Sequence, residues 1–214
     1  PDHEANSICG FCGVGCSLAI GTSNNRITEV NPAHLEKSVN GATLCVRGHF
    51  AHDFLNSKDR LISPLQLKKG DSEENEQVPL AWDEALDLVA DRLMEIKNKY
   101  GPQSIAFMGS SKCSNEENYL FQKMARVSVG TNNVDNGGYC SGQFLMRVLD
   151  EKTDGGCRVS PLADLESAET IVVLGADPNH SVPVVSYYLK RAARQGIPVI
   201  VVDPRRTELV NFAS

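Results

Sequence analysis

From residue 80 onward, apolar residues recur at helical spacing in three segments. The first helix is predicted to begin at a cap on Asp83 and to end at Tyr100, with an apolar face formed by Leu86, Val89, Leu93 and Ile96. A capping box of Ser114 and Glu117 predicts a second helix that reaches about residue 129. The third predicted helix covers residues 184–194. All three patterns are typical of helices that bury one face.

Short apolar runs stand between these helices. They cover residues 105–108, 171–174 and 199–202 and predict buried strands. Strands that alternate with helices indicate a parallel sheet with both faces covered. We therefore expect residues 61–214 to form a Rossmann-like parallel α/β domain, which is incomplete in this chain.

Residues 1–60 follow a different pattern. The apolar segment 17–20, a polar turn and the alternating segment 27–30 predict two antiparallel strands. This part is expected to be a small antiparallel β domain. The charged stretch 68–79, after this domain, is predicted to be an exposed loop.

Four of the seven cysteines gather in the small β domain. Cys9, Cys12 and Cys16 form a C-x2-C-x3-C pattern, and Cys45 follows after 28 residues. Thiolates spaced in this way suit the corners of an iron–sulfur cube, and the glycines between them let backbone N–H groups turn toward the sulfurs. A structural zinc ion is the alternative, although zinc sites usually have two C-x2-C pairs. The odd number of cysteines and the chain length disfavour a secreted disulfide framework.

Composition narrows the class of protein. The chain has 214 residues, 41% of them hydrophobic, which is enough for one or two domains with a real core. We expect no membrane span, because no apolar run reaches the length that a span needs. The net charge of -6, without a basic stripe, disfavours nucleic acid as a partner. Free thiols beside a cluster predict a cytoplasmic protein. Because the first residue is Pro1, we expect a piece of a longer protein.

Polar segments follow the last two predicted strands. Residues 175–180 read Gly-Ala-Asp-Pro-Asn-His, and residues 203–206 read Asp-Pro-Arg-Arg. In parallel α/β sheets, ligands bind outside the carboxyl ends of strands. There, Asp203 could accept hydrogen bonds from ribose or guanine, and Arg205 could bind phosphate. The G-x-G-x-x-G fingerprint of NAD sites is absent, and simple strand endings explain these residues equally well.

Several longer motifs resemble the molybdopterin oxidoreductases. The similarity covers about residues 8–207, and the family's cluster motif is matched by 8–16 and 44–48. Residues 115–123 and 130–135 closely resemble the catalytic subunit of formate dehydrogenases. The resemblance implies a [4Fe-4S] cluster and a molybdenum or tungsten ion held by two molybdopterin guanine dinucleotides. It also implies oxidation of formate to carbon dioxide, with electrons passed to a partner subunit or a ferredoxin-type carrier.

The same resemblance implies roles for particular residues. Cys9, Cys12, Cys16 and Cys45 would hold the cluster, and one dinucleotide would be cradled by Gly175, Asp177, Pro178, Asp203 and Arg205. Lys112 would lie beside a pterin or its phosphates, Arg47 between cluster and pterin, and Cys140 on the metal. The fragment alone is expected to be inactive, because the family takes its second dinucleotide site from later domains.

Four positions depart from the formate dehydrogenase pattern. Arg47 replaces the usual lysine, and Asp177 stands where asparagine is common. Cys140 comes one residue early and is followed by Ser141 instead of histidine. These departures keep an alternative open, an electron-transfer subunit of a NADH dehydrogenase-like complex that has a cluster but no metal-pterin.

The last two cysteines, Cys113 and Cys157, have no assigned chemistry. Free cysteines are among the residues most often buried, so both are expected to be small buried apolar residues.

Overall fold

The computed structural model describes residues 1–33, 38–69, 75–136, 148, 151 and 160–214. The chain forms two compact units. One unit joins Pro1–Asn56 with Ser141–Ser214, and the other is Ser57–Cys140. The first unit is therefore built from two segments that are far apart in the sequence.

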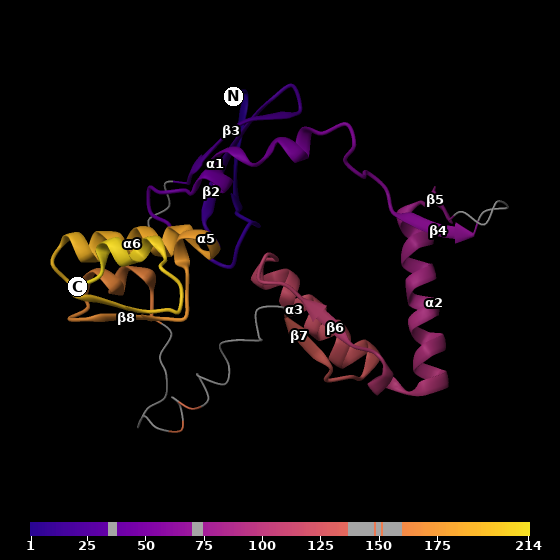
Figure 1. Ribbon diagram of the computed structural model, residues 1–214. Helices are drawn as coiled ribbons and strands as arrows, with labels where there is room; N and C mark the ends of the chain where they lie inside the picture. Colours follow the sequence, from indigo (N-terminus) through magenta and orange to yellow (C-terminus); the bar gives the residue numbers. More distant parts are fainter. Residues whose placement is uncertain (34–37, 70–74, 137–147, 149–150, 152–159) are drawn as a thin grey trace. The chain divides into compact units, whose positions relative to one another are not determined.

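The first unit contains a three-stranded antiparallel sheet in the order β1-β2-β3 (Figure 1). The strands are β1 (His3–Ile8), β2 (Ser17–Ser23) and β3 (Arg26–Pro32). The last two are the predicted hairpin, and its turn residues Asn24 and Asn25 adopt left-handed φ values of 50° and 58°. The sequence does not predict β1, because its residues show no apolar alternation. All six of them are exposed.

One core joins this sheet to the carboxyl-terminal part of the unit. After β3 the chain forms two short helices, α1 (Val46–Phe50) and η1 (Asp53–Asn56). The buried residues of the core are Cys9, Cys16, Leu18, Val30, Leu44, Val184 and Tyr188. Because the last two come from a distant helix, burial of apolar surface holds the two segments together.

The carboxyl-terminal part is a parallel strand pair covered by a helix. β8 (Ile171–Leu174) pairs with β9 (Val199–Val202), and α6 (Pro183–Arg194) lies along one side of the pair (Figure 1). Leu189 and Ala192 of α6 pack in a core with Ile171 and Val199. The predicted strands and helix of this part are thereby confirmed. Three short helices complete it: η4 (Leu162–Ser167), α5 (Pro178–Ser181) and η5 (Glu208–Phe212).

The second unit begins with an antiparallel hairpin and a long helix. β4 (Leu65–Lys69) pairs with β5 (Asn75–Pro79), so the prediction of an exposed loop over 68–79 is wrong in this respect. The sequence of segment 68–79 does not reveal these strands, because a strand is recognised by alternating apolar residues and this segment is rich in charged residues. α2 (Trp82–Tyr100) follows. Its amino end is capped by Glu84, which accepts from the backbone N–H of Ala81 at 3.1 Å, and not by Asp83 as predicted.

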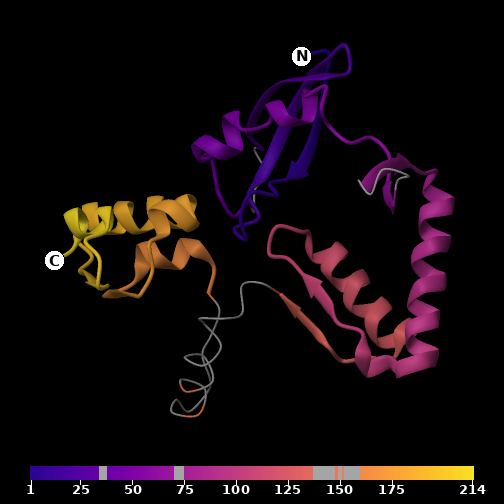
Figure 2. The ribbon, with the colours of Figure 1, turned by 45° about the vertical axis from the view of Figure 1, so that its right-hand side comes forward.

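The rest of the second unit is a parallel pair with a helix beside it (Figure 2). β6 (Phe107–Gly109) pairs with β7 (Val134–Asn136). The predicted capping box is confirmed, since Ser114 N–H donates to Glu117 Oε2 at 2.7 Å and Glu117 N–H to Ser114 Oγ at 3.1 Å. The helical segments are η2 (Pro102–Ser104), α3 (Asn115–Lys123) and the π-helix η3 (Met124–Val129).

These elements make a mixed α/β fold with a small antiparallel sheet, as predicted. The parallel strands described here form two separate pairs. A single Rossmann-like sheet and the division at residue 60 stay predictions. None of the described helices has both the length and the apolar character that crossing a bilayer requires.

Candidate functional site

The four candidate cluster cysteines lie in two loops of the first unit. Cys9, Cys12 and Cys16 occupy the loop between β1 and β2, which is closed by a 2.8 Å hydrogen bond from Cys9 N–H to Cys16 O. Gly15 allows the tight path because it adopts a φ of 71°. Cys45 directly precedes α1. All four are free thiols; three are buried and Cys12 is half-buried.

Burial and the neighbouring thiols set the pKa of two of the four cysteines. Burial raises the pKa of the Cys9 thiol, and Cys12 and Cys45 push it further up while Arg47 pulls it down. Burial likewise raises the pKa of Cys16 to about 12, with smaller contributions from the other three thiols. A metal centre here would therefore have to displace protons from Cys9 and Cys16, the two thiols whose pKa is raised.

The donor set fits an iron–sulfur cluster, which takes four cysteine thiolates. Within the ranges that the structure describes, no three His, Cys, Asp or Glu side chains surround the position of a single metal ion. The thiols are nevertheless close enough to influence one another's ionisation.

The loop after β9 holds an internal ion pair. The carboxylate of Asp203 accepts from Arg205 N–H at 2.8 Å and from Arg205 Nε at 3.2 Å. Its side chain is only 2% exposed, and these hydrogen bonds lower the pKa of Asp203. The guanidinium is two-thirds exposed, so it keeps donors free for an anion.

The loop after β8 brings a second carboxylate to the same guanidinium. Gly175 turns the chain with a φ of 60°, and Asp177 follows. Asp177 raises the pKa of Arg205, although less than Asp203 does. One carboxylate oxygen of Asp177 lies 2.8 Å from Nδ1 of His180, while its Oδ1 is buried without a partner. A buried acceptor of this kind fits a ligand with N–H donors, such as the edge of guanine. Pro178 is buried at the start of α5.

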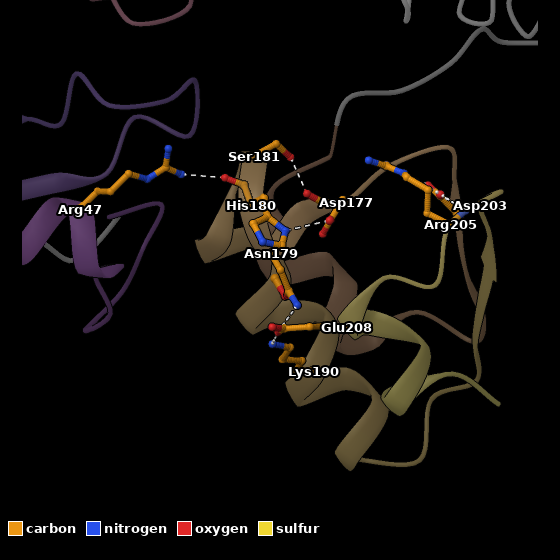
Figure 3. A network of polar contacts seen from close by, with 10 residues as sticks. Arg47, Asp177, Asn179, His180, Ser181, Lys190, Asp203, Arg205 and Glu208 are labelled. Atoms are coloured by element: carbon orange, nitrogen blue, oxygen red, sulfur yellow. Dashed lines mark hydrogen bonds and ion pairs between the residues drawn. The ribbon is translucent and has the colours of Figure 1, made fainter.

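Arg47, in the helix directly after Cys45, contacts α5, the short helix that follows the loop after β8. Its Nη2 donates to the carbonyl of His180 at 3.0 Å (Figure 3). Beyond it, Asn179 Nδ2 donates to Glu208 at 2.6 Å, and Lys190 lies 3.9 Å from the same carboxylate. A cavity of about 260 Å³ is lined here by Cys45, Val46, Asn179, Pro183, Ser186, Tyr187, Lys190 and Glu208. The predicted cluster site and the predicted dinucleotide site therefore adjoin within one unit.

The other predicted residues belong to the second unit or are not described. Lys112 is exposed in the turn after β6, where its N–H donates to Ser110 Oγ at 3.1 Å. The prediction that Cys113 is buried is wrong, because this turn lies at the surface and the thiol is exposed. Cys140, Ser141 and Cys157 lie outside the described residues.

Sequence reasoning missed two polar residues of the first unit. Asn40 is fully buried beside the cysteine loops. The Asn40-Gly41 dipeptide, a turn signal close before Cys45, could have drawn attention to it. Glu208 carries no local signal, because its partners come from α5 and α6.

Comparison with known families agrees with this architecture. The family model "Molybdopterin oxidoreductase Fe4S4 domain" matches residues 2–57, and "Molybdopterin oxidoreductase" matches residues 60–214. The chain belongs to the molybdopterin oxidoreductase family. It thus carries an Fe4S4 domain and a molybdopterin oxidoreductase domain.

Curated relatives include "Probable oxidoreductase YjgC" and "Putative formate dehydrogenase YrhE", both of Bacillus subtilis. Each is 40% identical to the chain over 211 residues, or 96% of this chain and 20% of the relative. The "Putative formate dehydrogenase SAB2186c" of Staphylococcus aureus is 39% identical over 215 residues, or 98% of this chain and 21% of the relative. The chain therefore spans about a fifth of the length of these relatives.

The fold also resembles that of the acetylene hydratase from Pelobacter acetylenicus. The TM-score is 0.69 at 19% sequence identity, with 98% of this chain and 28% of that chain covered. At this identity, the likeness concerns the fold alone.

Proposed function

We propose that this chain is part of a formate dehydrogenase that uses molybdenum or tungsten. Relatives of 39–40% identity over almost the whole chain, whose names include formate dehydrogenase, support this assignment. When bound, a metal-pterin centre would supply the two-electron chemistry that converts formate to carbon dioxide and a proton, and a cluster would supply one-electron transfer. We further propose that a partner subunit or a ferredoxin-type carrier receives the electrons.

The observation that carries the proposal is the contact of Arg47 with the carbonyl of His180. Arg47 lies two residues after Cys45, and His180 lies in α5, the short helix that follows the loop after β8. This hydrogen bond directly links the segment of the proposed cluster site to that of the proposed dinucleotide site. Cys9, Cys12, Cys16 and Cys45 would hold the cluster, and Arg47 would keep a positive charge between it and the pterin.

The proposed ligands of one guanine dinucleotide follow the carboxyl ends of β8 and β9. The partnerless Oδ1 of Asp177 would accept from guanine, and the exposed guanidinium of Arg205 would bind phosphate. Asp203 would orient Arg205, because its carboxylate already accepts from the guanidinium Nε at 3.2 Å and Nη2 at 3.4 Å. Gly175 leaves open space where a side chain would stand, and Pro178 fixes the start of α5. Lys112 is assigned to pterin or phosphate and Cys140 to the metal.

Elemental analysis of the full-length protein tests the assignment. Iron and acid-labile sulfide together with molybdenum or tungsten, and reduction of a dye that depends on formate, are expected. Iron alone, in protein produced with ample molybdenum and tungsten, would favour the electron-transfer subunit instead. Zinc without iron would refute both functions.

The variant Cys140→Ala tests the proposed metal ligand. We expect it to abolish formate oxidation and change the spectrum of the molybdenum or tungsten centre, while iron content stays at the wild-type level. The exposed Cys113 supplies a matched control, since Cys113→Ala removes a thiol from the same unit. Unchanged turnover in Cys140→Ala would show that this thiol is not the ligand.

A further inference from the structure

Asn40 is a completely buried polar residue that lies between the two cysteine loops. Its side chain is 0% exposed. Its carbonyl oxygen Oδ1 accepts from Ser17 N–H at 2.7 Å and from Ser38 Oγ at 2.7 Å. Ser17 is the residue directly after Cys16, so this end of the amide holds the loop that carries three of the four cysteines.

The other end of the same amide holds the loop that carries the fourth cysteine. Asn40 Nδ2 donates to the carbonyl of Thr43 at 2.8 Å and lies 3.4 Å from the carbonyls of Ser17 and Gly41. The backbone carbonyl of Asn40 in turn accepts from Thr43 N–H at 3.0 Å and from Thr43 Oγ1 at 2.7 Å. Thr43 stands two residues before Cys45, and Leu44 between them is buried in the core.

We propose that Asn40 is a positioning residue for the iron–sulfur cluster. One planar amide joins the backbone after Cys16 to the backbone before Cys45, and so sets the place of Cys45 relative to the other three thiols. Cys45 is the cysteine that most needs such a tie, because it is separated from the others by 28 residues of sequence. The inference rests on the proposed cluster, and it adds a residue that touches neither iron nor sulfide.

The substitution Asn40→Asp removes the hydrogen bond to Thr43 but can keep the one to Ser17. One carboxylate oxygen can replace Oδ1 toward Ser17, but the other would face the carbonyl of Thr43, which has no proton to offer. Asn56 is a matched control in the same unit, because its amide also bridges the backbone, from Ile27 N–H at 3.4 Å to Ile27 O at 3.2 Å. Asn56→Asp makes the same chemical change at an amide that bonds the backbone of Ile27 and not the backbone beside a cysteine.

The test compares iron release to a chelator from the wild-type full-length protein and both variants, together with their melting temperatures. Loss of a partner behind a metal ligand typically lowers affinity 10–100-fold, so we expect iron release from Asn40→Asp to be about tenfold faster or more. Electron paramagnetic resonance of the oxidised variant should show a cluster that has lost one iron. Asn56→Asp should release iron at the wild-type rate.

Equal release rates in Asn40→Asp and the wild type, or equal acceleration in Asn56→Asp, would overturn this inference alone. A wild-type protein that contains no iron or sulfide would overturn the proposed cluster as well. Thr43→Val is a milder variant that loses only the hydroxyl contact to the Asn40 carbonyl. If Asn40→Asp fails to fold, Thr43→Val should still speed iron release by about fivefold, and an unchanged rate would refute the positioning role.

Discussion

Replacement of Arg47 by glutamine is expected to lower the reduction potential of the cluster. The guanidinium acts on the cysteine site, since it pulls down the pKa of Cys9, which burial raises. A cation that favours a thiolate also favours the extra negative charge of a reduced cluster. Removal of the cation therefore makes reduction less favourable, and the potential falls.

The size of the shift follows from Coulomb's law. Two unit charges about 8 Å apart interact by about 2 kcal/mol at an effective dielectric constant of about 20. Arg47 is partly exposed, so solvent screening reduces this to about 1 kcal/mol. For a one-electron couple, about 1 kcal/mol corresponds to about 40 mV.

A redox titration of the full-length protein, followed by the paramagnetic signal of the reduced cluster, measures the shift. Arg47→Lys keeps the charge and should stay near the wild-type potential, although it loses the planar fork. Arg26→Gln in the β2–β3 hairpin removes a charge at another place in the same unit and serves as control. The reasoning is refuted if Arg47→Gln shifts the potential no more than Arg26→Gln does.

Three further changes test other parts of the first unit. Cys45→Ser should remove most of the iron, whereas Cys113→Ser, at an exposed thiol, should leave iron content unchanged. Tyr188→Phe loses the 3.2 Å hydrogen bond from its hydroxyl to the carbonyl of Val39, and thermal or denaturant unfolding should show a loss of about 1 kcal/mol. Asp203→Asn should lower the melting temperature near neutral pH, because the pKa of Asp203 is depressed by Arg205; this difference should vanish as pH falls through the folded-state pKa, and a difference that persists there would contradict the ion-pair account.

The elements with strong local signals could be predicted from the sequence. The helix at Ser114 is recognised from its capping box, and α6 is recognised from its apolar face. Both signals lie within a few neighbouring residues. β1 and the β4–β5 hairpin could not be found in this way. Their residues alternate little in polarity, and their pairing depends on partners elsewhere in the chain.

The candidate site was predictable to a different degree in each part. The cysteine spacing identified the four thiols, because a cluster demands this residue type in close succession. The sequence predicts a ligand for Asp203 and for Arg205 and does not show that their side chains pair with each other, although only Pro204 separates them. The exposure of Cys113 was also beyond sequence reasoning, because burial depends on what the rest of the fold places over a turn.

Two hydrogen bonds that join the two segments of the first unit could not be predicted from the sequence. Arg47 and Tyr188 each donate to a backbone carbonyl, at His180 and Val39 respectively. Every residue has such an acceptor, so only the donor in each pair has a required identity. Substitutions at the two donors should therefore weaken the connection between the amino-terminal segment of the first unit and its helices α5 and α6. Substitutions at the two acceptors that keep the backbone path should leave it intact, which is why these couplings follow from geometry and not from residue type.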